Sequence, residues 1–157
     1  MSVKLTYSVI FFAFAVLCHA ATTITPVQPT LKNGCYQISN AAELYGFAAI
    51  VNGADDFPYD ATACGKLTKD IVVNQNVLNS DGTLNVADTA NFAKWTPIGP
   101  FYGTFDGQKH TVSGLYYSSE TITGAGLFKS IASAENQNKN TVVKNVGVVG
   151  SFFRAGY

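Results

Sequence analysis

The sequence predicts a mainly β protein folded as a parallel β-helix, a solenoid in which successive coils stack on one another. Between Trp95 and Leu127, glycine interrupts short apolar runs every few residues, and no helical period is present. This pattern is typical of short strands joined by sharp turns. Segments 112–117 and 143–148 both carry apolar residues at their first, fourth and sixth positions, about thirty residues apart. A repeat at this spacing favours a solenoid.

The first twenty residues have the pattern of a secretory signal peptide. One cation, Lys4, precedes an apolar run from Val9 to Cys18, and small residues surround a cleavage point after Ala20. A transmembrane anchor is the alternative, but the run has only about ten to fourteen residues where a spanning helix needs ~20. Lipoprotein processing at Cys18 is a second alternative, and Leu17 stands where it would need a small residue. We therefore expect an exported chain without a membrane span after cleavage.

Removal of this leader would leave two cysteines, Cys35 and Cys64. An even pair in an exported chain predicts a disulfide, whereas two free thiols would imply a reducing compartment and contradict the leader. The bridge would close a loop of about thirty residues, which the chain-entropy model values at about 3 to 4 kcal/mol.

The charge pattern gives no sign of a nucleic-acid or membrane-surface partner. Ten basic residues balance ten acidic ones, and the cations form no cluster. A basic footprint for nucleic acid and a polybasic patch for lipid are thus both missing from the sequence. No residue spacing indicates a metal or cofactor, so we expect none.

The mature N-terminal region is expected to hold the only helix. Residues 21–33 are rich in Thr and Pro and predict an extended spacer. Residues 34–63 are expected to form an N-terminal cap around a helix at 40–51, because Asn40 suits the N-terminus of a helix and Gly53 suits its end. The expected buried face of this helix consists of Leu44, Phe47, Ala48 and Val51.

A solenoid that begins at residue 64 would expose a backbone edge at its first coil, which would invite pairing with another chain. The helix at 40–51, tethered through the cysteine pair, is placed in the sequence to cover that edge. The other end, 150–157, is apolar and aromatic. We therefore expect coils over 64–157 that continue beyond residue 157, so that the solenoid is incomplete at the C-terminus.

Within the coils, residues 66–74 predict a strand and 79–82 a turn, while 85–91 is ambiguous. The strand at 66–74 has Leu67, Ile71 and Val73 as its expected buried set. Further along, the residues expected to point inward are Val112, Leu115, Leu127, Phe128, Ile131, Val146 and Val148.

The segment G-T-F-D-G-Q-K-H-T-V-S-G-L at 103–115 resembles bacterial secreted and surface proteins with GLUG-type repeats. The flanking W-T-P-I-G, G-L-F and V-K-N-V-G-V segments also match, so the resemblance covers roughly residues 64–150. Lys129 departs from the pattern, because it stands where the family has glycine after G-L-F. The N-G-C-Y-Q-I-S-N segment that starts at Asn33 looks like exported proteins of fibre-degrading Gram-negative bacteria. The family implies a right-handed parallel β-helix on an adhesin-like protein but no single activity.

The residues most suited to acid or base catalysis are Asp106, His110 and Arg154. The structural interpretation of each is favoured: Asp106 begins an Asp-Gly turn, His110 begins a strand, and Arg154 is the only arginine. Glycoside hydrolysis would also need a second positioned carboxylate, and the sequence near Asp106 offers none.

Three loop aspartates, Asp55, Asp56 and Asp60, are candidate calcium ligands, but their spacing lacks the alternation and the bidentate glutamate of an EF-hand loop. Solvated loop charges are the favoured interpretation. Two aromatic residues, Tyr102 and Tyr116, are candidates for contact with a glycan or protein, because planar rings exposed to solvent suit stacking. Trp95 is expected to be buried.

These observations predict an exported, non-catalytic module, secreted or on the surface of a Gram-negative bacterium. Its expected role is adhesion, or contact with an extracellular glycan or surface protein. The alternative is the N-terminal part of a polysaccharide lyase or hydrolase whose active coils lie beyond residue 157.

Overall fold

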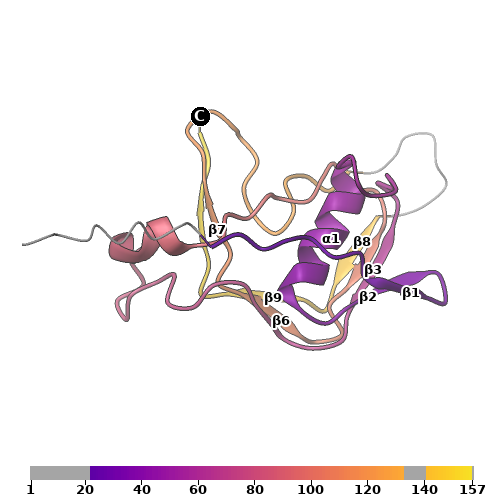
Figure 1. The fold of residues 1–157 in the computed structure, drawn as a ribbon, viewed down its shortest axis with the longest axis horizontal. Coiled ribbons are helices and arrows are strands. Elements are labelled where there is room, and N and C mark those ends of the chain that lie inside the picture. The colour runs from indigo at the N-terminus through magenta and orange to yellow at the C-terminus, as the bar shows by residue number, and fades with distance from the viewer. Residues whose placement is uncertain (1–21, 133–140, 157) are drawn as a thin grey trace, which may run out of the picture.

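The computed structural model describes residues 22–132 and 141–156, and the expected signal peptide at 1–20 lies outside them. The described residues form ten short strands, one α-helix and one 3-10 helix. The strands make three small sheets, with the α-helix beside the largest of them (Figure 1).

The largest sheet is mixed and has five strands in the order β1-β2-β3-β5-β8. Strand β1 runs antiparallel to β2, whereas β2, β3, β5 and β8 pair in parallel. The strands are β1 (Thr30–Lys32), β2 (Cys35–Ile38), β3 (Cys64–Leu67), β5 (Thr104–Asp106) and β8 (Val142–Lys144).

The two smaller sheets are parallel. One contains β4 (Ile71–Val72), β6 (Thr111–Ser113) and β9 (Gly147–Val149), in that order. The other pairs β7 (Tyr116–Ser118) with β10 (Phe152–Arg154). The chain therefore turns a corner between sheets after every few residues.

The prediction of a right-handed parallel β-helix over 64–157 is wrong. The strands are two to four residues long, and they belong to separate small sheets, one of which is mixed. A solenoid also repeats at a steady interval, but here paired residues are 29 apart for Tyr36 and Gly65, 40 apart for Cys64 and Thr104, and 36 apart for Thr111 and Gly147. The glycine pattern sets where the chain turns without setting a constant repeat length.

The short repeat in the sequence also has a different register in the structure. Its apolar positions align Val112 with Val143, whereas Val112 pairs with Val148 and Val143 pairs with Phe105. The expected capping role of the helix is likewise corrected, because the outer edge of β2 is covered by the antiparallel strand β1.

The helix itself is confirmed. Helix α1 spans Ala41–Asn52, and the Asn40 side chain caps it by accepting a hydrogen bond from the Glu43 N–H. Glu43 adds a further link at this end, since its Oε2 accepts hydrogen bonds from the backbone N–H and the hydroxyl of Ser39, the residue before the cap. Gly53 ends the helix in the left-handed conformation, with φ of 72°.

Residues 22–29, part of the expected spacer, lie against α1. The Val27 N–H donates to the Ala42 carbonyl at 2.9 Å. A Cβ at Gly46 would sit 1.9 Å from the Val27 carbonyl oxygen, so this close approach requires glycine at position 46.

The core lies between α1 and the sheets, and Phe47 is at its centre. This ring is fully buried and makes edge or tilted contacts with Tyr36, Phe101 and Phe105, which come from three different segments. The fully or nearly fully buried side chains around it include Ile38, Leu44, Ile50, Leu67, Ile71, Trp95, Ile98, Val112 and Leu115.

The inward set predicted from the sequence is confirmed only in part. Val112, Leu115 and Leu127 are buried, and Phe128 and Val146 pack against the core while partly exposed. Ile131 and Val148 are 53% and 40% exposed.

Three other local predictions concern a strand, a turn and an ambiguous segment. The predicted strand at 66–74 is divided between β3 and β4 by a corner. It buries Leu67 and Ile71 as expected, whereas Val73 is only partly buried. The turn at 79–82 is confirmed by a hydrogen bond from the Gly82 N–H to the Asn79 carbonyl. The ambiguous segment forms the 3-10 helix Val86–Asn91.

Phe47→Ala is expected to lower the free energy of unfolding by about 3 to 5 kcal/mol, because it removes a buried ring that three segments share. Urea denaturation of the mature chain measures this change. The matched control is Val86→Ala, where a 73% exposed side chain predicts a change within about 0.5 kcal/mol. A loss below about 1 kcal/mol for Phe47→Ala would contradict its central place in the core.

Replacing Cys35 and Cys64 together by alanine is expected to lower the free energy of unfolding by about 3 to 4 kcal/mol, since the bridge closes a loop of 29 residues in the unfolded chain. Urea denaturation with and without reductant checks this. Reductant should destabilise the natural chain and leave the variant unchanged. Equal stability of the variant and the oxidised chain would refute the prediction.

Candidate functional site

The disulfide predicted between Cys35 and Cys64 is confirmed and joins β2 to β3. Such a bond indicates an oxidising, extracellular environment. None of the helices in the described part of the chain has the length and apolar character of a membrane span.

A backbone ladder between β3 and β5 builds the surface around this disulfide. The ladder starts before the strands, because the N–H groups of Tyr102 and Thr104 donate to the carbonyls of Ala61 and Ala63. Side chains alternate across such a ladder. Phe101, Phe105 and Gly65 are accordingly buried, whereas Thr62, Cys64, Tyr102 and Thr104 are partly exposed on the outer face.

These outer residues line an open pocket of about 460 Å³. Its lining is mainly polar. The lining consists of Gly34, Asp60, Thr62, Ala63, Cys64, Tyr102, Gly103 and Thr104. Tyr102, one of the two tyrosines that the sequence suggested for ligand contact, therefore lies in a concave site.

A close backbone approach shapes the floor of the pocket. A Cβ at Gly103 would lie 2.1 Å from the Ala63 carbonyl oxygen, so only glycine allows the two segments to run this close. On the opposite side, Gly34 occupies the β1–β2 turn with φ of 76°, and no atom lies within 4 Å of where its Cβ would be.

Asp60, which lines the same pocket as Tyr102, is held in a fixed orientation. Its Oδ1 accepts hydrogen bonds from the backbone N–H of Thr62 at 2.8 Å and from the Thr62 hydroxyl at 2.7 Å. Its backbone N–H donates to the Ile50 carbonyl, which ties this loop to α1. The carboxylate is thus a preorganised acceptor at the edge of the pocket.

Tyr116, the second tyrosine suggested by the sequence, lies on β7 in a different sheet. Its ring stacks on Phe152 with centroids 6.1 Å apart and also contacts the ring of Phe92 at 5.4 Å. The structure therefore does not bring it together with Tyr102, and aromatic neighbours already pack against its ring. Trp95 is 2% exposed, as expected.

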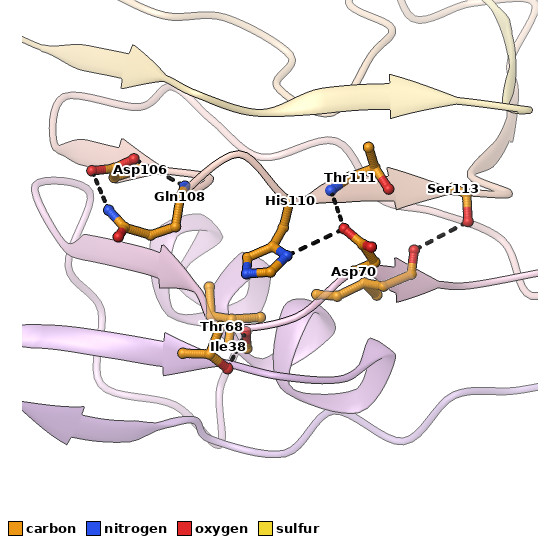
Figure 2. Close-up of polar contacts among 9 residues, drawn as sticks. Ile38, Thr68, Asp70, Asp106, Gln108, His110, Thr111 and Ser113 are labelled. Atoms are coloured by element: carbon orange, nitrogen blue, oxygen red, sulfur yellow. Dashed lines mark hydrogen bonds and ion pairs between the residues drawn. The ribbon is translucent and has the colours of Figure 1, made fainter.

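Three residues engage Asp106: Gln108, whose contacts Figure 2 shows, Asn145 and Lys144. The Gln108 backbone and amide donate to its two oxygens at 3.0 and 2.6 Å, and the Asn145 amide donates at 3.1 Å. Lys144 lies 3.6 Å away. The backbone hydrogen bond from Gln108 is the main cause that lowers the pKa of Asp106, helped by Asn145 and the Lys144 charge.

His110 forms a separate polar group with Asp70, as Figure 2 shows. Its Nδ1 lies 3.3 Å from Asp70 Oδ1, which also accepts the Thr111 N–H at 2.8 Å. The Thr111 hydrogen bond is the main cause that lowers the pKa of Asp70, and His110 adds to it. Arg154 instead faces Glu120 at 3.5 Å. The three catalytic candidates thus belong to three different clusters.

The loop aspartates do not gather around a common point. Asp55 and Asp56 are exposed, while Asp60 binds Thr62. Among residues 22–132 and 141–156, no group of three or more His, Cys, Asp or Glu side chains is arranged to hold a metal ion.

From the sequence, Asp60 is a candidate only for calcium binding and Asp70 is not singled out, although a local pattern marks both residues. Asp60 precedes Thr62 in the same Asp-x-Thr arrangement as Asp81 and Thr83, where Asp81 Oδ1 also accepts the Thr backbone and hydroxyl. This arrangement predicts an Asx turn. Asp70 stands at the corner between two strands, where a short acidic side chain can accept a neighbouring N–H.

No protein-family model, curated protein or solved structure matches the chain. The resemblance of residues 103–115 to GLUG-type repeats therefore stays a prediction.

Asp106→Asn is expected to make stability less dependent on pH in acid. The folded chain holds the pKa of Asp106 below its usual value, near 3.9, so the unfolded chain binds protons first as pH falls. The stabilisation is complete above that usual value and is lost as pH falls through the lowered pKa. The variant should have a lower urea midpoint than the natural chain at pH 7, because its amide turns a donor toward Gln108 or Lys144.

The difference between the two proteins should shrink as the pH is lowered from about 5 to about 2, since the natural side chain then also becomes neutral. Urea midpoints measured across this range check the prediction. A difference that stays constant with pH would show that the charge of Asp106 is not what the surrounding donors stabilise.

Proposed function

We propose that this chain is an exported, non-catalytic module that contacts an extracellular glycan at the bacterial surface or in the medium. The single observation that carries the proposal is the half-buried Tyr102 ring in a polar pocket of about 460 Å³, beside the oriented carboxylate of Asp60. Apolar ring surface combined with a few positioned polar groups is the usual composition of a small-molecule binding site.

Export is supported by the leader pattern at 1–20 and by the disulfide. The similarity of residues 103–115 to bacterial secreted and surface proteins supports the bacterial setting. The engagement of the acidic candidates supports a contact role: Asp106 is 7% exposed and already accepts from Gln108 and Asn145. A carboxylate held ionised in this way is poorly prepared to give up a proton as a general acid.

Tyr102→Ala tests the proposal in a binding assay. The mature chain is incubated with cellulose and other insoluble fibres, and both bound protein and released sugar are measured. The natural chain should bind without releasing sugar, and the variant should bind about tenfold more weakly, equivalent to ~1.4 kcal/mol.

Tyr59→Ala is the matched control, because Tyr59 is 68% exposed and lies outside the pocket lining. It should bind as the natural chain does. Equal loss in both variants would remove Tyr102 from the contact, and released sugar would point to an enzyme.

A further inference from the structure

The polar surface does not end at the pocket but continues along the same two strands. After Tyr102, the side chains on the same face of β5 are those of Thr104 and the largely buried Asp106, and on β3 Cys64 is followed on this face by Lys66. Four residues of extended chain from Tyr102 to Asp106 span about 13 Å. We call this surface, which carries Thr62, Cys64, Lys66, Tyr102 and Thr104, the outer strip.

The two ends of the outer strip differ in charge. Asp60 lies at the Tyr102 end, and no described residue donates to its Oδ2, because Thr62 binds only Oδ1. Lys66 lies at the other end, paired in register with Asp106 across the ladder. Asp106 itself faces Lys144, and no carboxylate in the described part of the chain is within ion-pair distance of the Lys66 ammonium. One acceptor and one donor are therefore available at opposite ends.

We infer that the outer strip binds a short linear stretch of an uncharged glycan, roughly two or three linked rings. This inference rests on the proposed function and names the ligand class for that site. The first ring stacks on Tyr102 and donates a hydroxyl to Asp60. The following rings pass over Cys64 and Thr104, and the last accepts a hydrogen bond from Lys66.

The chemistry of the pocket favours a neutral ring there. A uronic acid at Tyr102 would place a second carboxylate close to Asp60, and like charges at short range disfavour binding. Hydroxyl groups, in contrast, can donate to the free oxygen of Asp60 while the ring carbons cover the tyrosine. The strip follows the direction of β3 and β5, with β2 and β8 on either side, and this favours a linear chain.

Calorimetric titration with glucose oligosaccharides of increasing length tests this inference. The affinity of the natural chain should rise up to about three units and then level off, because the strip is about 13 Å long. Galacturonic acid oligosaccharides of equal length should bind at least about fivefold more weakly. Asp60→Asn, which keeps an acceptor oxygen for Thr62, should reduce this discrimination.

Lys66→Met separates the strip from the pocket. It should lower the affinity for a glucose oligosaccharide of three units about fivefold, equivalent to ~1 kcal/mol of binding free energy, and leave the affinity for a single glucose unit unchanged. Lys69→Met, at the corner after β3, is the matched control and should bind as the natural chain does. Unchanged melting temperatures for the three variants establish that they fold.

Two results would overturn the inference: equal affinity for glucose oligosaccharides of one and three units, or an unchanged affinity of Lys66→Met for the oligosaccharide of three units. If the natural chain still binds fibres in either case, the proposed function stands. Equal or tighter binding of the acidic oligosaccharides would overturn the choice of an uncharged ligand. Failure of the natural chain to bind any fibre or oligosaccharide would overturn the proposed function itself.

Discussion

The parallel ladder between residues 61–67 and 102–106 is the constraint on which both the core and the candidate site depend. One face of this ladder carries Gly65 and Phe105 into contact with Phe47. The other face carries Tyr102 and Thr104 into the polar pocket. Because side chains alternate strictly along a strand, a slip by one residue would move the aromatic core outward and the pocket residues inward. The packing of the core therefore also fixes the composition of the outer face.

Two further interactions hold the ladder in place. The disulfide links β3 to β2, and α1 supplies the ring of Phe47 that fills the space left by Gly65, where a Cβ would lie 2.8 Å from that ring. Small chains with few regular hydrogen bonds gain much from such cross-links, because a strand of three or four residues contributes little on its own. The loop from Gly53 to Ala63 is fixed at both ends by these elements, and it is this loop that presents Asp60.

The local elements were predictable from the sequence, and the long-range register was not. Asn40, Glu43 and Gly53 mark the helix because capping depends on residues close together in the chain. The cysteine pair is predictable because only two cysteines follow the expected leader. Pairing distance depends instead on how much chain each corner and insertion consumes, such as the 3-10 segment between β4 and β5. Glycine spacing carries no record of these lengths, which is why the sequence pattern aligns Val112 with Val143, although Val112 pairs with Val148 in the structure.

Tyr102 could be suggested as a contact residue, but its partner Asp60 is 42 positions away and only the ladder brings the two together.

The placement of the pocket on a hydrogen-bonded ladder bears on how it can recognise a ligand. Binding costs free energy for every side chain that must be ordered, and a glycan already loses much of its own freedom on binding. Tyrosine has few rotatable bonds, and Asp60 is held by two hydrogen bonds before any ligand arrives. Both groups therefore add little further ordering cost. Asp106 and His110 are also fixed, but their polar atoms are directed at Gln108 and Asp70, within the protein. Preorganised polar groups that face their own chain stabilise the turn at 107–110, whereas those that line an open pocket remain available to a partner.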